Sequence, residues 1–287
     1  MPIEPRTVTV FLDASASGTK RAAHAVALAQ RWGAHLTGVH VVFAGVTSHP
    51  SICYVRGDSA IQQVIVDECD LEAVAEAASI LLGRRFRALC AGASVAGEFR
   101  AIRRGRTAEE AVMSSLQSDL VVVGHPQPHG LPDDMSPERM LLASGVPLLI
   151  VPNAWEGPTI GNRILIGWNA TRQARRAIFD GMGFLVAAAA VTVLVIDQVG
   201  RPPHGQDREP GADIALDLIR YGVSVSVDRV ASHGRPIAQV ILASAVRSGS
   251  DLLVIGAYSH ARLREILLGG TTRTLLARMP VPVLISR

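Results

Sequence analysis

The chain of 287 residues has few aromatic residues, few cysteines and no apolar segment long enough to cross a membrane. Aromatic residues make up 4% and hydrophobic residues 48%, so aliphatic side chains must fill the core. The most apolar window, Phe184 to Ile196, is too short for a bilayer core of about 30 Å. No long apolar stretch follows a basic region near the start, which argues against a signal peptide. We therefore expect a cytoplasmic protein without membrane insertion.

Neither the cysteines nor the charges predict a disulfide framework or a nucleic-acid surface. Cys53, Cys69 and Cys90 are odd in number and lack paired spacing, which is typical of free thiols in a reducing compartment. The formal net charge is only +3 and the arginines are spread along the chain. A basic patch for nucleic acid is therefore not indicated.

Motifs for nucleophilic catalysis are also missing. The sequence has no Gly-x-Ser-x-Gly, no Gly-x4-Gly-Lys-Ser/Thr and no Cys/His signature. Without a metal site or general base, efficient phosphoryl transfer is not indicated, although weak ATP hydrolysis stays open. His125, His129, Asp133 and Asp134 would suit zinc if they converged, but the intervening prolines favour a polar loop. We expect no catalytic residue and no metal.

Short apolar runs alternate with helical segments twice along the chain, which predicts an α/β protein with parallel sheets. The most direct internal match is Asp119–Gly124 (DLVVVG) with Asp251–Gly256 (DLLVIG), and Pro147-Leu-Leu-Ile likewise matches Pro282-Val-Leu-Ile. A long helix is expected from about Asp58 to Cys90, with Gly83 as a candidate interruption, and a shorter one from Thr171 to Leu185. Ser15 or Ser17 is expected to cap a helix that runs to about Trp32, and Ser136-Pro137 to begin one that runs to about Ser144. The predicted division is a first domain at residues 1–152, a linker at 153–162 and a second domain at 163–287.

A glycine-rich segment near the end offers a phosphate site. Gly269-Gly270-Thr271-Thr272 follows the apolar run Leu252–Ile255, and Thr271 is expected to cap a helix that runs through Arg278. Backbone N–H groups at such a turn lack intrahelical partners, and the helix dipole favours an anion there. The alternative is that the two glycines only end one helix and begin the next.

The chain resembles a tandem universal stress protein over essentially its whole length. The segments that carry the resemblance are HLTGVHVV at His35–Val42, GRTAEEAV at Gly105–Val112, DLVVVG at Asp119–Gly124 and PVPVLISR at Pro280–Arg287. The resemblance implies two doubly wound domains, each a five-stranded parallel sheet of order 3-2-1-4-5 between helices. It also implies an internal pseudo-dimer in which the fifth strands pair, and it leaves a homodimer of two chains open.

Nucleotide-binding members of this family carry Gly-x2-Gly-x9-Gly-Ser/Thr after strand four and an acidic residue after strand one. In the second half Gly256 and Gly269 match two of the glycines, whereas Ser259 and Gly270 depart from the pattern, and Asn169 replaces the acid. An amide can still bind adenine or ribose, with less strength than a carboxylate. The resemblance implies a site for adenine nucleotide at Trp168, Asn169, Ile196, Gly256, Ser259, His260, Gly269, Gly270, Thr271 and Thr272.

The first half departs differently. It keeps Asp13 after its first strand, either as a ligand contact or as a helix cap. The loop after Gly124 is rich in proline and includes Asp133 and Asp134, which would repel phosphate.

The expected function is a stress-response regulatory module that binds ATP, ADP or AMP in the second half. The alternatives are a nucleotide-independent protein-interaction module and a binder of a small apolar ligand through the first half, where the 58–90 region would cover a pocket.

Overall fold

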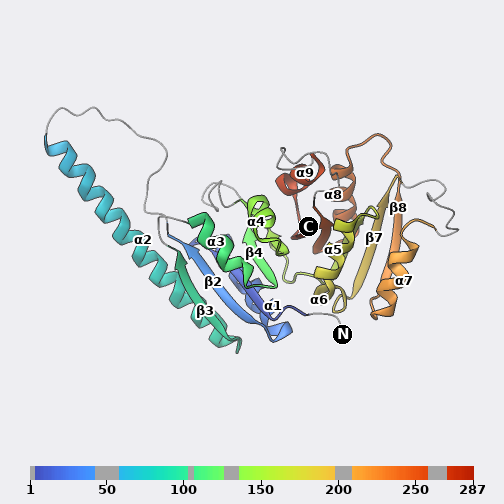
Figure 1. The fold of residues 1–287 in the computed structure, drawn as a ribbon, viewed down its shortest axis with the longest axis horizontal. Helices are drawn as coiled ribbons and strands as arrows, with labels where there is room; N and C mark the ends of the chain where they lie inside the picture. Colours follow the sequence, from blue (N-terminus) through green and yellow to red (C-terminus); the bar gives the residue numbers. More distant parts are fainter. Residues whose placement is uncertain (1–3, 43–57, 103–106, 126–135, 198–208, 258–269) are drawn as a thin grey trace.

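A computed structural model describes residues 4–42, 58–102, 107–125, 136–197, 209–257 and 270–287 (Figure 1). The elements of the first half are β1 (Thr7–Leu12), α1 (Ala16–Trp32), β2 (His35–Val41), α2 (Asp58–Gly92), β3 (Gly97–Ile102), α3 (Thr107–Leu116), β4 (Leu120–Gly124), α4 (Pro137–Ser144) and β5 (Leu148–Val151). Those of the second half are β6 (Arg163–Trp168), α5 (Arg172–Asp180), α6 (Met182–Leu185), β7 (Ala190–Ile196), α7 (Ala212–Arg220), β8 (Val225–Val230), α8 (Ile237–Arg247), β9 (Leu252–Gly256), α9 (Gly270–Arg278) and β10 (Val283–Ser286).

The described strands form one sheet of ten, in the order β3-β2-β1-β4-β5-β10-β9-β6-β7-β8. Within each half the strands are parallel and follow the order 3-2-1-4-5, which confirms the predicted fold. The fifth strands, β5 and β10, pair antiparallel, with Leu149 opposite Leu284. The predicted internal pairing of the two halves is therefore confirmed, whereas the linker boundaries stay a prediction.

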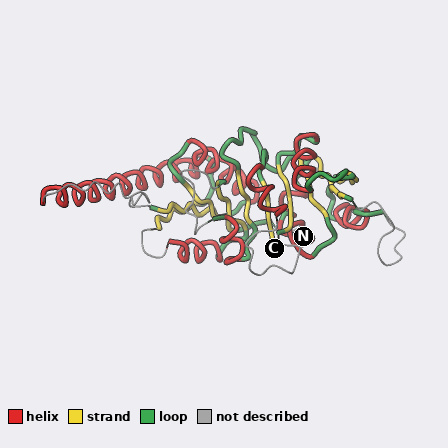
Figure 2. The backbone as a smooth tube through the Cα atoms, turned by 90° about the horizontal axis from the view of Figure 1, so that it is seen from above, coloured by secondary structure: helices red, strands yellow, loops and turns green. Residues whose placement is uncertain are grey.

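The inner strands are buried on both faces because helices cover both sides of the sheet (Figure 2), whereas the outer strands β3 and β8 are partly exposed. All side chains of the run Leu120–Val123 are buried, as are those of Leu252–Ile255. One core cluster lies under α1, α2, α5, α6 and α7, and the other lies under α4, α8 and α9. Leu149 and Leu284 belong to the same cluster, so the core continues across the junction between the halves. Unbroken aliphatic runs are typical of such doubly covered parallel strands.

Aromatic packing and side-chain hydrogen bonds also connect the two halves. Trp32 of α1 meets Phe184 of α6 edge to face, with ring centroids 4.8 Å apart. The Trp32 indole also donates to the Gly183 carbonyl over 3.3 Å. His125, which follows β4, donates from Nε2 to the Leu276 carbonyl of α9 over 2.6 Å. These contacts join residues more than 150 positions apart.

Three local expectations need correction. Gly83 does not interrupt α2: a Cβ there would lie 2.8 Å from the Phe99 ring, so glycine permits close packing on β3. The helix expected at residues 171–185 is instead divided at Gly181 into α5 and α6. Thr271 is the second residue of α9, which begins at Gly270, and is not its cap.

Helix α2 extends past the edge of the sheet in both views (Figure 1 and Figure 2). Its C-terminal part packs on β2 and β3 through Phe86 and Cys90, and the buried Cys90 is a free thiol, as expected of core filler. Val74, Ile80 and Leu81 are instead exposed. No helix within the described ranges is both long and apolar enough to cross a membrane.

Candidate functional site

The second half brings four of the predicted site residues together at the carboxyl edge of its sheet. Strand β6 lies between β7 and β9, and all three run parallel. Trp168 pairs with Val195, and Gly167 pairs with Ile255, so the next residues in each strand are neighbours. Those neighbours are Trp168, Asn169, Ile196 and Gly256. Strand order reverses at β6, which is where open parallel sheets bind ligands.

Asn169 takes part in the cap of α5. The Thr171 hydroxyl donates to Asn169 Oδ1 over 2.7 Å and accepts the Ala174 N–H over 3.3 Å. Asn169 is exposed, and Ala170 between the two has a left-handed φ of 54°. The side-chain oxygen of Asn169 is thus engaged, and its amide nitrogen supplies the donors that remain for a ligand.

Trp168 and Ile196 are both half-buried. Trp168 packs against the core cluster under α5, and Ile196 packs against the cluster on the other face. Each residue ends its strand, so one part of the side chain belongs to the core and the rest borders the edge.

Gly256 is required by the backbone whether or not a ligand binds. A Cβ at this position would lie 2.3 Å from the Gln173 carbonyl carbon and 2.4 Å from the Ala174 nitrogen. Real Cβ atoms do not approach backbone so closely, so α5 can pack on the end of β9 only because residue 256 is glycine. The match of Gly256 to a phosphate motif therefore has an independent structural reason.

The other predicted site residues are less well placed. Ser259, His260 and Gly269 lie outside the described residues. Gly270 and Thr271 form the start of α9, and Thr272 is buried with 8% of its surface exposed. The first turn of α9 contains no acidic residue, so no carboxylate there would repel an anion at the positive end of the helix dipole.

The corresponding edge of the first half is occupied by an arginine of the chain itself. The buried Arg21 forms an ion pair with Asp13, and its Nε donates to the Phe11 carbonyl over 3.0 Å. A Cβ on Gly124 would lie 2.0 Å from Arg21 Nη1, so the guanidinium lies against this glycine. Asp13 is therefore neither a free ligand contact nor the cap, since Ser15 caps α1 by accepting the Gly18 N–H over 2.9 Å.

The electrostatics of Asp13 follow from this arrangement. Partial burial acts to raise the pKa of the Asp13 carboxyl, but the Arg21 charge and the hydrogen bonds from Ser15 outweigh it and hold the pKa below its usual value. Sequence reasoning missed Arg21. Its only signal was a cation among the apolar positions Ala22, Ala25 and Val26 of the predicted helix.

The zinc alternative receives no support from the described part of the chain, where no three potential ligands gather. His125 points its Nε2 at the Leu276 carbonyl. His129, Asp133 and Asp134 lie outside the described residues.

Comparison with known proteins agrees with this architecture. Residues 163–287 match the model of the universal stress protein family. Universal stress protein Slr1230 from Synechocystis is 22% identical over 151 residues, which cover 52% of this chain and only 50% of that protein. A universal stress protein of Archaeoglobus fulgidus has a TM-score of 0.67 at 17% identity, covering 98% of this chain and 96% of that one. The functionally unknown PA1789 of Pseudomonas aeruginosa has a TM-score of 0.55 at 16% identity, covering 98% and 92%. Residues 163–287 are therefore similar to the universal stress protein family, and the chain as a whole shares the fold of these structural relatives.

Proposed function

We propose that this protein is a stress-response regulatory module that binds an adenine nucleotide at the carboxyl edge of its second half. One difference between the halves carries the proposal. Thr171 caps α5 as Ser15 caps α1, and six residues after each cap stand Ala177 and Arg21. Ala177 is fully buried and uncharged, so among the described residues of the second half α5 has no counterpart of the arginine that occupies the first edge.

Each residue of the edge has a role in this proposal. The Asn169 amide donates to an acceptor of the adenosine, and Trp168 and Ile196 border its apolar faces. The start of α9 at Gly270, with the residues before it, binds the phosphates through backbone N–H groups. Binding would act on partners through α5, since the backbone of Gln173 lies against Gly256.

The proposal contains no chemical step. Binding and release suffice for a regulatory module, and none of the edge residues is assigned a role as nucleophile or general base. Hydrolysis of ATP is a separate outcome that the same preparation can be tested for.

The test is calorimetric titration of ATP, ADP and AMP into refolded protein freed of carried-over ligand. Micromolar binding, near about −8 kcal/mol, is expected for at least one nucleotide. The variant Gly269→Val/Gly270→Val should lose it. Ser136→Ala, at the start of α4 in the first half, is the matched control and should bind as the wild type does. Absence of binding by folded wild type would overturn the proposal.

A second candidate is a protein-interaction module that works without nucleotide. Its support is the exposure of apolar side chains on α2, with Val74 at 66%, Ile80 at 49% and Leu81 at 49%. Contiguous exposed apolar surface commonly marks a contact for a partner. Val74→Lys/Leu81→Lys should then abolish partner capture while leaving the fold intact. That a small apolar ligand binds under this helix stays a prediction.

A further inference from the structure

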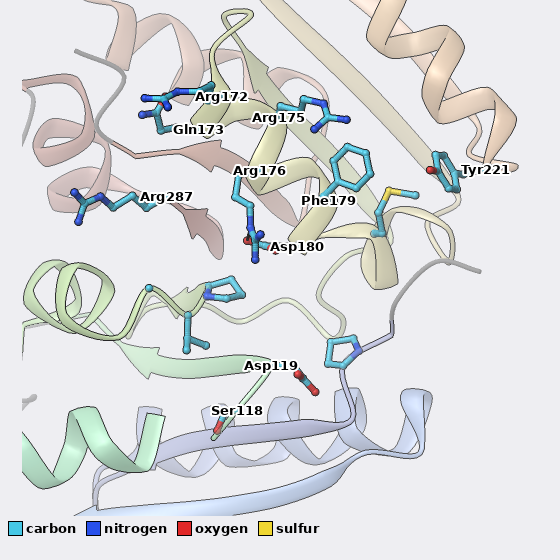
Figure 3. Close-up of a pocket in the computed structure, with 15 residues that line it drawn as sticks. Ser118, Asp119, Arg172, Gln173, Arg175, Arg176, Phe179, Asp180, Tyr221 and Arg287 are labelled. Atoms are coloured by element: carbon cyan, nitrogen blue, oxygen red, sulfur yellow. Dashed lines mark hydrogen bonds and ion pairs between the residues drawn. The ribbon is translucent and has the colours of Figure 1, made fainter. Parts of the chain in front are cut away.

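A cleft of about 1020 Å³ lies between the two halves, beside the nucleotide edge: Gln173, whose backbone lies against Gly256, is among its lining residues (Figure 3). Helix α5 and the start of α6 form one wall, and the residues that precede β4 and β5 form the other. Concave sites for small molecules have volumes of about 300–1,000 Å³, so this cleft has the size of a ligand site. Its lining joins segments from both halves, including Asp119, Pro147, Arg176 and Met182.

Arginines dominate the charge of the cleft. Arg172, Arg175 and Arg176 of α5 line it, together with Arg287. In Figure 3 Arg176 points toward Asp180, with Arg172 on one side and Arg175 beside Phe179 on the other. The Arg175 guanidinium lies 4.6 Å from the centre of the Phe179 ring. The α5 side of the cleft is therefore cationic with an aromatic surface beside it.

The two carboxylates in the cleft are already hydrogen-bonded. Asp180 Oδ2 accepts from Arg176 Nε over 2.9 Å and from the Ser286 hydroxyl. Asp119 Oδ2 accepts the backbone N–H groups of Arg6 and Thr7 over 2.8 and 2.9 Å. Within the described residues neither carboxylate pairs with Arg172 or Arg175, which are both exposed. Their charges remain to be balanced by solvent ions or by a ligand.

The charged residues of α5 stand at positions that lower the stability of the helix itself. Arg172 is the first residue of the helix and Asp180 the last, although the helix dipole favours the opposite placement. Arg172 and Arg176 are also like charges four positions apart, which repel. Helix α7 shows the favourable arrangement, with Asp213 in its first turn and Arg220 in its last. Charges that cost local stability are expected where they serve a site.

We propose that this cleft binds a small molecule that carries phosphate groups. Arg172, Arg175 and Arg176 bind the phosphates, because the planar guanidinium matches phosphate oxygens with two parallel hydrogen bonds. The apolar part of the ligand lies on Phe179 and Met182. Since the lining comes from both halves, the bound ligand holds the two halves in a fixed relative position. This site does not depend on nucleotide binding at the edge, although α5 borders both.

The test uses inorganic pyrophosphate as the probe, titrated calorimetrically into the intact protein at low salt. Wild type should bind it, and Arg172→Gln/Arg176→Gln should weaken binding at least about tenfold. Arg220→Gln on α7 is the matched control: Arg220 is also exposed and paired with an aspartate, and lies outside the cleft. It should change the dissociation constant by less than about twofold.

The loop variant Gly269→Val/Gly270→Val separates the two proposals. Pyrophosphate binding that survives in the loop variant and falls in the arginine variant supports the cleft. Loss in the loop variant alone places the probe at the nucleotide edge and overturns the inference. An equal loss of pyrophosphate binding in Arg220→Gln, or no pyrophosphate binding by wild type, also overturns the inference. A rise in melting temperature with pyrophosphate, absent in the folded arginine variant, is the independent readout.

Discussion

The guanidinium of Arg21 lies against Gly124 and forms an ion pair with the carboxylate of Asp13, at the edge where the second half has Ala177. The side chain of Arg21 is 4% exposed and that of Asp13 is 28% exposed. Within the described residues, two halves with the same strand order thus differ in whether a helix arginine occupies their edge. The contributions of this ion pair, and of the contacts that join the halves, to the free energy of unfolding can be measured with variants.

Replacing Asp13 should be costly, because it leaves a buried cation without its partner. Asp13→Asn is expected to lower the free energy of unfolding by about 3 kcal/mol. Lys20→Gln breaks the ion pair with Glu156, whose side chains are 47% and 74% exposed, and should cost less than about 1 kcal/mol. Urea denaturation of the three proteins checks this. Similar losses in both variants would contradict a special role for the buried pair.

The contribution of Asp13 should vanish in acid. Its carboxyl pKa is lowered in the folded protein: burial opposes this, and Arg21 and Ser15 outweigh burial. The unfolded pKa is about 3.9, so the stabilisation is full above that pH and is lost as pH falls through the lower folded pKa. The difference in unfolding free energy between wild type and Asp13→Asn should therefore shrink below about pH 4. A difference that stays constant down to the lowest pH at which the protein folds would refute this.

Gly256 should tolerate no side chain. Gly256→Ala places a Cβ against the backbone of Gln173 and should destabilise the protein by about 2 kcal/mol. Gly92 ends α2 with no atom near its potential Cβ, so Gly92→Ala should be neutral or stabilising by up to about 1 kcal/mol. Thermal and urea unfolding distinguish the two. An unaffected Gly256→Ala protein would show that α5 can withdraw from β9.

The Trp32–Phe184 contact should couple the stability of the halves. Each alanine variant is expected to lose about 3–5 kcal/mol, because both side chains are buried. A double-mutant cycle should give a coupling of about 1 kcal/mol from the edge-to-face geometry. Ile219→Ala, at a residue that is 54% exposed, should change stability by less than about 0.5 kcal/mol. Strictly additive losses from the two aromatic variants would mean that the rings do not couple the halves.

Much of the fold was determined by local sequence. Aliphatic runs such as Leu120–Val123 and Leu252–Ile255 are short and have no polar face, which is typical of strands covered on both sides. The capping residue Ser136 also acts on neighbours a few positions away, and α4 begins at Pro137, where the sequence places it. The resemblance then supplied the strand order, which local patterns alone do not contain.

Only the tertiary structure decided what occupies each edge and each cleft. Arg21 reaches Asp13 and Gly124 because α1 packs back across β1 and β4, and nothing adjacent to it in sequence indicates that direction. Gly83 and Gly256 are glycines because distant elements approach them, which a motif cannot distinguish from a phosphate contact. The arginine-lined cleft joins α5 to residues more than 50 positions earlier in the chain. Local sequence fixes periodicity and caps, whereas contacts between distant segments depend on how the whole sheet is assembled.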